Sequence, residues 1–267
     1  NADAHYFRKS NESTEHLRID SSGRLLIGTT TEGYVSADNL TVADAANAGI
    51  TIRSGTGNLG TIAFSDGTTG AAEYDGYIQY SQADQYMDFG GAGGNIRLRI
   101  DSSGNLLAGS TSSRTLNSHV PKLQVTGTTY SHSTVSIINN EANINGAYLF
   151  FGKQRSGSPG GSTVVQDDDI VGHLRFSVGD GTDMESRVAY IEAFVDGTPG
   201  SNDTPGRLTF STTPDGSATP VERLRISSAG NFGVGTNNPL TKAHIHGGDE
   251  TLLVTGDTAA TSAANTG

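Results

Sequence analysis

One segment recurs three times along this chain and constrains its fold more than any other feature. Its copies read EHLRIDSSGRLLIG at 15–28, IRLRIDSSGNLLAG at 96–109 and ERLRISSAGNFGVG at 222–235. Self-similarity of this kind is typical of repeat architectures, in which each copy is one supersecondary unit. The copies are unevenly spaced, which predicts modules of variable length rather than a tight solenoid.

Each copy is predicted to form a β-hairpin. In its first half aliphatic residues flank one arginine, and a period of two places the aliphatics on one face and the arginine on the other. These arginines are Arg18, Arg99 and Arg225. The middle of each copy has turn chemistry, in which a glycine supplies the positive φ of a short hairpin loop. These glycines are Gly23, Gly104 and Gly230.

The rest of the chain repeats around these hairpins. A second short strand follows each hairpin, at 40–42, 122–127 and 242–247, and we place it at the start of a module. The predicted organisation is the end of a preceding β-module at 1–28, a linker at 29–39, a complete β-module at 40–109, a linker at 110–121, a complete β-module with inserted loops at 122–235, and a linker with the start of a further, truncated module at 236–267. The truncated last module and the start at Asn1 suggest a piece of a longer chain.

Composition excludes several classes of protein. The chain of 267 residues has 36 Gly, no Cys and a formal net charge of -11. Without Cys, neither a disulfide scaffold nor a thiolate metal site is possible. A strongly acidic chain with no Lys/Arg cluster is not expected to bind nucleic acid. No run of 18 apolar residues occurs, so we expect no membrane insertion.

The fold class follows from the pattern of short strands. No stretch shows helical apolar spacing between caps, and alternating strands bounded by Gly, Asn, Asp and Ser run throughout. We therefore predict an all-β fold. Each module is poor in apolar residues, and its open edges would seek partners. Rotational assembly of identical chains resolves both problems. The prediction is tandem small β-modules, hairpin-like or sandwich-like, strung along a fibre axis in an intertwined homotrimer.

The recurring signature Glu-Arg-Leu-Arg-Ile-Asp-Ser-Ser-Gly-Asn-x-x-x-Gly-Thr resembles a module in tail-fibre and other virion-surface fibre proteins of tailed bacteriophages. It is especially similar to the marine and cyanobacterial phage type, and the resemblance runs from Glu15 to about Gly256. It implies a homotrimer, located extracellularly on the virion, that carries host-recognition surfaces. In that family the repeat region is usually upstream of an endosialidase-type chaperone domain, whose cleavage dyad is not in this sequence.

His244 and His246 form the sharpest single motif. Paired imidazoles from each chain of a trimer could hold a transition metal on the axis, since neutral imidazole suits such metals. Strand alternation argues against this site. Ala243 and Ile245 take the inward positions, which turns both histidines outward.

Aromatic residues gather at 74–89, and four of them are candidates for contact with a host-surface glycan: Tyr74, Tyr77, Tyr80 and Tyr86. An exposed tyrosine stacks on a sugar ring and donates a hydrogen bond. The alternative is that these residues pack within the module, as aromatic strand residues usually do. Tyr77 and Tyr80 fall on opposite faces of one strand, so at most one of them faces solvent.

Two loops rich in Gly, Ser, Pro and Asp lengthen the second module, at 148–169 and 197–206. Loops on a rigid scaffold tolerate change and carry binding. Lys153, Gln154 and Arg155 are therefore candidates for contact with a glycan or protein receptor. The acidic run 167–169 either collects a cation through oxygen ligands or is a solvated loop. It lacks the residue pattern of an EF-hand, which favours the solvated loop.

The repeated arginines have a functional and a structural interpretation. They could contact an anionic receptor, but their recurrence beside Glu15 or Glu222 favours cross-strand or interchain ion pairs. No Gly-x-Ser-x-Gly elbow, P-loop or His-Glu-x-x-His motif occurs, so we expect no enzyme and no cofactor.

The predicted function is structural. The chain is expected to be a component of a phage tail fibre or other virion fibre that supports host attachment, with other virion proteins as partners. Three chains offer repeated weak sites, so avidity replaces single-site affinity. The alternatives are a tailspike polysaccharide depolymerase and a bacterial surface adhesin.

Overall fold

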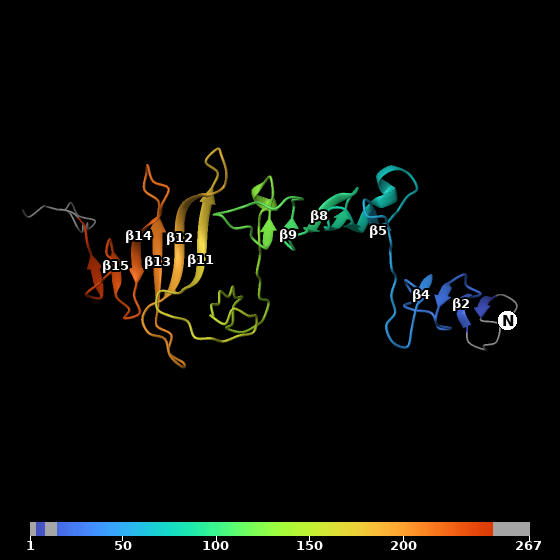
Figure 1. Ribbon diagram of the computed structural model, residues 1–267, viewed down its shortest axis with the longest axis horizontal. Coiled ribbons are helices and arrows are strands. Elements are labelled where there is room, and N and C mark those ends of the chain that lie inside the picture. Colours follow the sequence, from blue (N-terminus) through green and yellow to red (C-terminus); the bar gives the residue numbers. More distant parts are fainter. Residues whose placement is uncertain (1–3, 9–14, 248–267) are drawn as a thin grey trace, which may run out of the picture. The chain divides into compact units, whose positions relative to one another are not determined.

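A computed structural model describes residues 4–8 and 15–247 (Figure 1). Their regular structure consists of sixteen strands and two short 3₁₀ helices, which confirms the all-β fold class. Residues 248–267 of the predicted last module lie outside the described residues. The chain divides into two compact units, residues 1–103 and 104–267.

The first unit contains two groups of strands. Strands β1 to β4 form one sheet in sequence order, in which β1–β2 and β2–β3 are antiparallel and β3–β4 is parallel. Strands β5 to β8 form an antiparallel meander, with the 3₁₀ helix η1 (Gly70–Tyr74) between β5 and β6. The strand bounds are β1 His5–Arg8, β2 Glu15–Ile19, β3 Leu25–Ile27, β4 Leu40–Val42, β5 Leu59–Phe64, β6 Gly76–Ser81, β7 Met87–Gly91 and β8 Asn95–Ile100.

The second unit begins with the parallel pair β9–β10 and the 3₁₀ helix η2 (Tyr130–His132). A six-stranded sheet follows, in the order β11-β12-β13-β14-β15-β16, which is antiparallel up to the parallel pair β15–β16 (Figure 1). The bounds are β9 Leu106–Ala108, β10 Leu123–Val125, β11 Ile170–Val178, β12 Ser186–Val195, β13 Gly206–Thr212, β14 Val221–Ile226, β15 Phe232–Val234 and β16 Ala243–Ile245.

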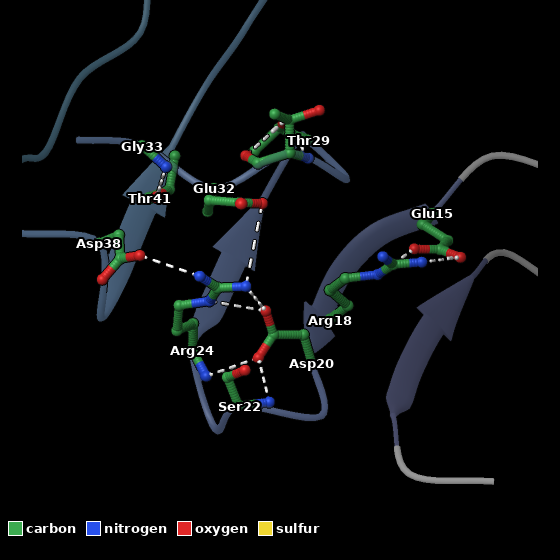
Figure 2. Close-up of polar contacts among 11 residues, drawn as sticks. Glu15, Arg18, Asp20, Ser22, Arg24, Thr29, Glu32, Gly33, Asp38 and Thr41 are labelled. Atoms are coloured by element: carbon green, nitrogen blue, oxygen red, sulfur yellow. Dashed lines mark hydrogen bonds and ion pairs between the residues drawn. The ribbon is translucent and has the colours of Figure 1, made fainter. Parts of the chain in front are cut away.

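The first hairpin shows how its sequence makes the turn (Figure 2). The Asp20 carboxylate accepts hydrogen bonds from the backbone N–H groups of Ser22 (2.8 Å) and Arg24 (3.0 Å), and Gly23 has a φ of +79°. The Arg24 side chain then binds both Asp20 and Asp38, at 2.7 and 2.9 Å. The turn is therefore fixed by its own aspartate and tied to the segment 29–39, which we had predicted as a linker.

The short strand after each hairpin pairs in parallel with the return strand before it: β4 with β3, β10 with β9, and β16 with β15. We had placed this strand at the start of the next module. By strand pairing it closes the preceding hairpin instead, because a short connection brings it back alongside the return strand. The module boundaries themselves stay a prediction.

A glycine at the end of each return strand makes this parallel pairing possible. Their φ values are positive, +73°, +78° and +68° for Gly28, Gly109 and Gly235. A Cβ atom at these positions would lie 2.0, 2.1 and 2.2 Å from a backbone carbonyl oxygen just after the parallel strand. Those oxygens belong to Ala43, Thr126 and His246. Only glycine fits both the backbone conformation and the close approach of the two chain segments.

One face of the six-stranded sheet is apolar across its full width. A single row runs in register over all six strands: Leu174, Ile191, Phe210, Leu224, Val234 and Ile245. Much of this apolar face is exposed, since Leu174, Phe176 and Ile226 are 44%, 50% and 43% exposed. Phe150 and Phe151 of the first inserted loop lie beside its Leu174 and Ile191. In the first unit, Ile62, Ile78, Phe89 and Leu98 form a matching row. There Ile62 is 48% exposed.

The opposite face, which carries the arginines, is the covered one. We had expected the aliphatics and the arginines on different faces, and strand pairing places them so. Within one chain the arginine face is the more covered of the two, because Leu26, the cross-strand partner of Arg18, is buried, as are Tyr190 and Thr209 of the last sheet. Paired arginine side chains lie over this face. Only four apolar residues among the described ones are buried, namely Leu26, Leu107, Tyr190 and Val195.

The repeated arginines make ion pairs, two of them within a strand. Arg18 binds Glu15, and Arg225 binds Glu222. Residues three apart on a strand normally point to opposite faces, but the register of β2 and β14 shifts by one residue between them. This β-bulge brings acid and arginine to one face. The middle repeat has no acid at the matching position, Ile96, and Arg99 binds Asp88 of the neighbouring strand β7 instead.

Removing the acid should cost most in the middle repeat. The Asp88 side chain is 1% exposed and accepts two hydrogen bonds of 2.7 Å from Arg99, which also stacks on Tyr86. Asp88→Asn is expected to lower the free energy of unfolding by roughly 1–3 kcal/mol, because a buried charged donor loses its partner. Glu222→Gln, at a site 28% exposed, should cost less than about 1 kcal/mol. Urea denaturation compares the two variants, and equal losses would contradict this account.

Candidate functional site

The two loops that lengthen the second module meet and line one pocket. The pocket has a volume of about 710 Å³. The first loop contributes Lys153, Gln154 and residues 161–165, and the second contributes Pro199, Gly200, Ser201 and Thr204. Length comparison between the modules identified both loops, but we had named candidate residues only in the first one. The extra length of the second module at 197–206 was the signal that could have identified the lining residues of the second loop.

Three consecutive aspartates hold the loops in place, and each has a different partner. Asp167 accepts a hydrogen bond of 2.6 Å from the backbone N–H of Gly197 in the second loop. Asp168 binds the Arg207 guanidinium of β13 at 2.6 Å. Asp169 forms a two-pronged pair with Arg155, with both contacts at 2.6 Å. The acidic run thus ties both loops and the sheet together, and its carboxylates do not converge on one point.

The Asp169–Arg155 pair is the best-defined electrostatic feature of the site. Hydrogen bonds from Arg155, and then one from the backbone N–H of Gln166, lower the pKa of the Asp169 carboxyl to about 2. A folded-state pKa below the ordinary value of 3.8 means that the ionised form stabilises the fold. This contribution is present above the ordinary pKa and is lost as the pH falls through about 2.

The titration of Asp169 in its pair with Arg155 can be observed directly. The amide N–H of Gln166 donates to Asp169 at 2.9 Å, so its NMR chemical shift should report protonation of the carboxylate. We expect a midpoint near 2 in the unmodified chain and no such titration in Asp169→Asn. In that variant the amide signals of residues 153–165 should also broaden or shift, because the first loop loses its tie to Arg155. A titration midpoint near the ordinary pKa of 3.8 would show that the Asp169–Arg155 pair does not form.

The three candidate residues of the first loop have different surroundings. Lys153 is exposed and lines the pocket. Gln154 also lines the pocket, and its Nε2 donates to the backbone oxygen of Ser158 at 3.1 Å, which holds the loop's own turn. Arg155 does not line the pocket and binds Asp169. Lys153 is therefore available to a ligand, whereas Gln154, whose amide oxygen also accepts from the backbone N–H of Ser156, and Arg155 support the loop.

The four candidate tyrosines have different surroundings in the first unit. The Tyr77 hydroxyl donates to the backbone oxygen of Gly94 at 3.2 Å, and burial raises the pKa of this phenol. Tyr86 lies under the Arg99 guanidinium, 3.6 Å from its ring centre. Tyr80 pairs with Met87, and Tyr74 is 48% exposed. Two of the four thus have structural contacts, and Tyr74 is the most available to a ligand.

The histidine pair lies on and just after β16. His244 is in register with Gly233, on the face opposite Ala243 and Ile245, as strand alternation predicts. Its Nδ1 accepts a hydrogen bond of 3.3 Å from the backbone N–H of Leu240, and the two imidazole rings lie 6.4 Å apart, edge to face.

The middle residues of the other parallel strands bind the connecting loop in the same way. Thr41 accepts a hydrogen bond of 3.1 Å from the backbone N–H of Gly33, and Gln124 accepts one of 2.9 Å from that of Arg114. His244 thus has a repeated structural role. Within residues 4–8 and 15–247 of a single chain, no three His, Asp or Glu side chains gather as a metal site.

No protein-family model matches the chain, and no curated protein sequence matches it. Among the part of the chain that the structure describes, no helix is long and apolar enough to cross a membrane. Solved structures do match. The carboxy-terminal domain of the bacteriophage T5 L-shaped tail fibre with its intramolecular chaperone domain is similar at a TM-score of 0.58 and 13% identity, over 84% of this chain and 69% of that chain.

A second structure of the carboxy-terminal domain of the bacteriophage T5 L-shaped tail fibre is similar at a TM-score of 0.55 and 13% identity. This match covers 96% of the present chain and 99% of that one. At this level of identity the similarity concerns the fold. The chain has the β-rich fold of phage tail fibre domains.

Proposed function

We propose that this chain is a structural component of a tail fibre, or of another surface fibre, on the virion of a tailed bacteriophage. The observation that carries the proposal is the apolar face that both units leave largely exposed. It is supported by the similarity to tail fibre domains and by the recurring fibre-type signature. The proposed location is outside the host cell, on the virion surface.

The open apolar face favours assembly with copies of the same chain. Exposed contiguous apolar surface of this kind marks an interaction site. Phe64 and Phe176 occupy matching positions of the two complete modules and are 58% and 50% exposed. Identical chains bring the same apolar face to a common rotation axis, which no single chain can do. The proposed assembly is a homotrimer in which these faces form the shared core.

Host attachment is the role proposed for the fibre. The support is the pair of inserted loops, which line a surface pocket on a scaffold of regular strands. Three copies would present three equal pockets, so weak binding at each would add to strong adhesion. The proposed role is not catalytic. Asp167, Asp168 and Asp169 beside the pocket each bind a backbone N–H group or an arginine, unlike the free carboxylate pair that glycoside hydrolysis needs.

Immunogold microscopy tests the proposed role. Antibodies raised against the chain should label a fibre outside the capsid of intact virions and should block adsorption to the host. Gold restricted to the capsid interior, or the absence of the chain from virions, would contradict the proposal. Release of reducing ends from a host polysaccharide by the purified chain would instead favour a depolymerase.

The finer family assignment is also a proposal. The signature suggests the marine and cyanobacterial type of fibre, with an endosialidase-type chaperone domain encoded further along the same gene. The first of the two similar structures includes an intramolecular chaperone domain of its own. Sequencing the gene beyond the codon for Gly267 tests this part directly.

A further inference from the structure

We infer that the pocket between the two inserted loops binds a neutral saccharide of the host surface. This inference rests on the attachment role proposed above and adds the chemical class of the ligand. The pocket volume of about 710 Å³ lies within the range of small-molecule sites, which is about 300–1,000 Å³. It belongs wholly to the second unit.

The lining has the two-sided chemistry of a sugar ring. Val164, Val165 and Pro199 offer apolar surface to the C–H groups of a ring. Thr163 and Ser201 offer hydroxyl groups that both donate and accept hydrogen bonds, as sugar hydroxyls require. A pocket for a protein partner is usually lined by aromatic or large apolar residues, which bury a hydrophobic side chain of that partner. The described lining has no such residue.

Charge decides between neutral and acidic saccharides. Among the described residues that line the pocket, Lys153 is the only charged one, and it provides a donor for one hydroxyl or ring oxygen. The run 167–169 and Asp203 place four carboxylates on or next to the two loops, and Arg155 and Arg207 pair with only two of them. The chain as a whole has a net charge of -11, and this negative charge repels a polyanion at long range. A neutral saccharide avoids that cost.

The pocket is held in shape before any ligand arrives. Asp167 ties the first loop to the second through the Gly197 N–H, and Asp169 ties Arg155 to the end of the first loop. Asp196, at the start of the second loop, binds Arg207 of β13 at 3.1 Å. These contacts reduce the ordering cost that a loop site otherwise incurs on binding.

Saturation-transfer NMR on the full chain tests the inference with three neutral probes, maltotriose, mannotriose and galactotriose, and one acidic probe, trigalacturonate. We expect at least one neutral trisaccharide to bind and trigalacturonate to bind more weakly. Ser201→Trp should abolish binding by filling the pocket. Ala218→Trp, in the exposed loop between β13 and β14, is the matched control and should bind normally. Lys153→Ala should weaken binding about fivefold, the effect of one hydrogen bond, and Arg53→Ala, which removes the same charge in the first unit, should not.

Adhesion of the labelled chain to host cells, measured in parallel, separates the two claims. If the chain adheres but no neutral trisaccharide binds, or if Ser201→Trp binds sugar as the unmodified chain does, the pocket inference is wrong and the attachment role stands. Tighter binding of trigalacturonate than of every neutral probe also overturns the inference. If the chain does not adhere to cells at all, the proposed attachment role itself fails.

Discussion

Replacing Gly109 by alanine is expected to destabilise the chain by about 3 kcal/mol. A left-handed backbone costs a residue with a Cβ atom about 1–2 kcal/mol, and forcing an atom into a packed site costs about 1–3 kcal/mol more. Both costs apply here, because Gly109 has a φ of +78° and its added Cβ would lie 2.1 Å from the Thr126 carbonyl oxygen. The parallel pair β9–β10 should therefore separate or shift. Urea denaturation measures the loss.

Gly104→Ala is the matched control, because it lies in the same repeat and has a similar φ of +73°. Apart from its two chain neighbours, no described residue has an atom within 4 Å of the added Cβ. This variant should pay only the backbone cost of about 1–2 kcal/mol. Equal destabilisation by the two substitutions would show that the close approach of β9 and β10 does not require glycine.

An aspartate in place of Ile62 should convert the proposed trimer into a monomer. Ile62 lies in register with Ile78 on the apolar face of the first unit and is 48% exposed. In the proposed trimer this position is buried in all three chains. Burying a polar group without a partner costs roughly 2–7 kcal/mol per chain, and an ionised carboxylate costs more. Native mass spectrometry at micromolar concentration should then detect mainly the single chain.

Ala63→Asp introduces the same charge one residue along the same strand. Ala63 pairs with Tyr77 on the opposite face and is also exposed. Both variants thus carry the same loss of stability from an aspartate in a β-strand. They differ only in the face of the sheet on which the new charge lies. Ala63→Asp should keep the trimer. If both variants stay trimeric, the apolar face is not the contact between chains.

Local features of this fold were predictable from the sequence. The hairpins follow from the period of two around Arg18 and Arg225 and from the turn glycines Gly23 and Gly230. These signals are local, since a turn needs a positive φ and a strand needs alternation, and neither depends on distant residues. The inserted loops were also visible, because the second module is longer than the first.

Features that depend on contacts distant in sequence were not predictable. The bulge that brings Glu222 and Arg225 to one face leaves no periodic signal, and the pairing of β16 with β15 depends on the Gly235 backbone approaching His246. Alternation alone also could not show which face one chain covers by itself, because that depends on how arginine side chains lie. Ser201 was not predicted as a candidate beside Lys153, because the two residues meet only through the contact between two loops distant in sequence.

The native mass of the unmodified chain decides whether three chains share one apolar core. One chain has a mass of 27.7 kDa, and its described residues bury only four apolar residues. Over a dilution series we expect an assembly of three chains that persists at micromolar concentration. A single folded chain of 27.7 kDa at every concentration would contradict it, because the apolar faces would then be stable in water without a partner.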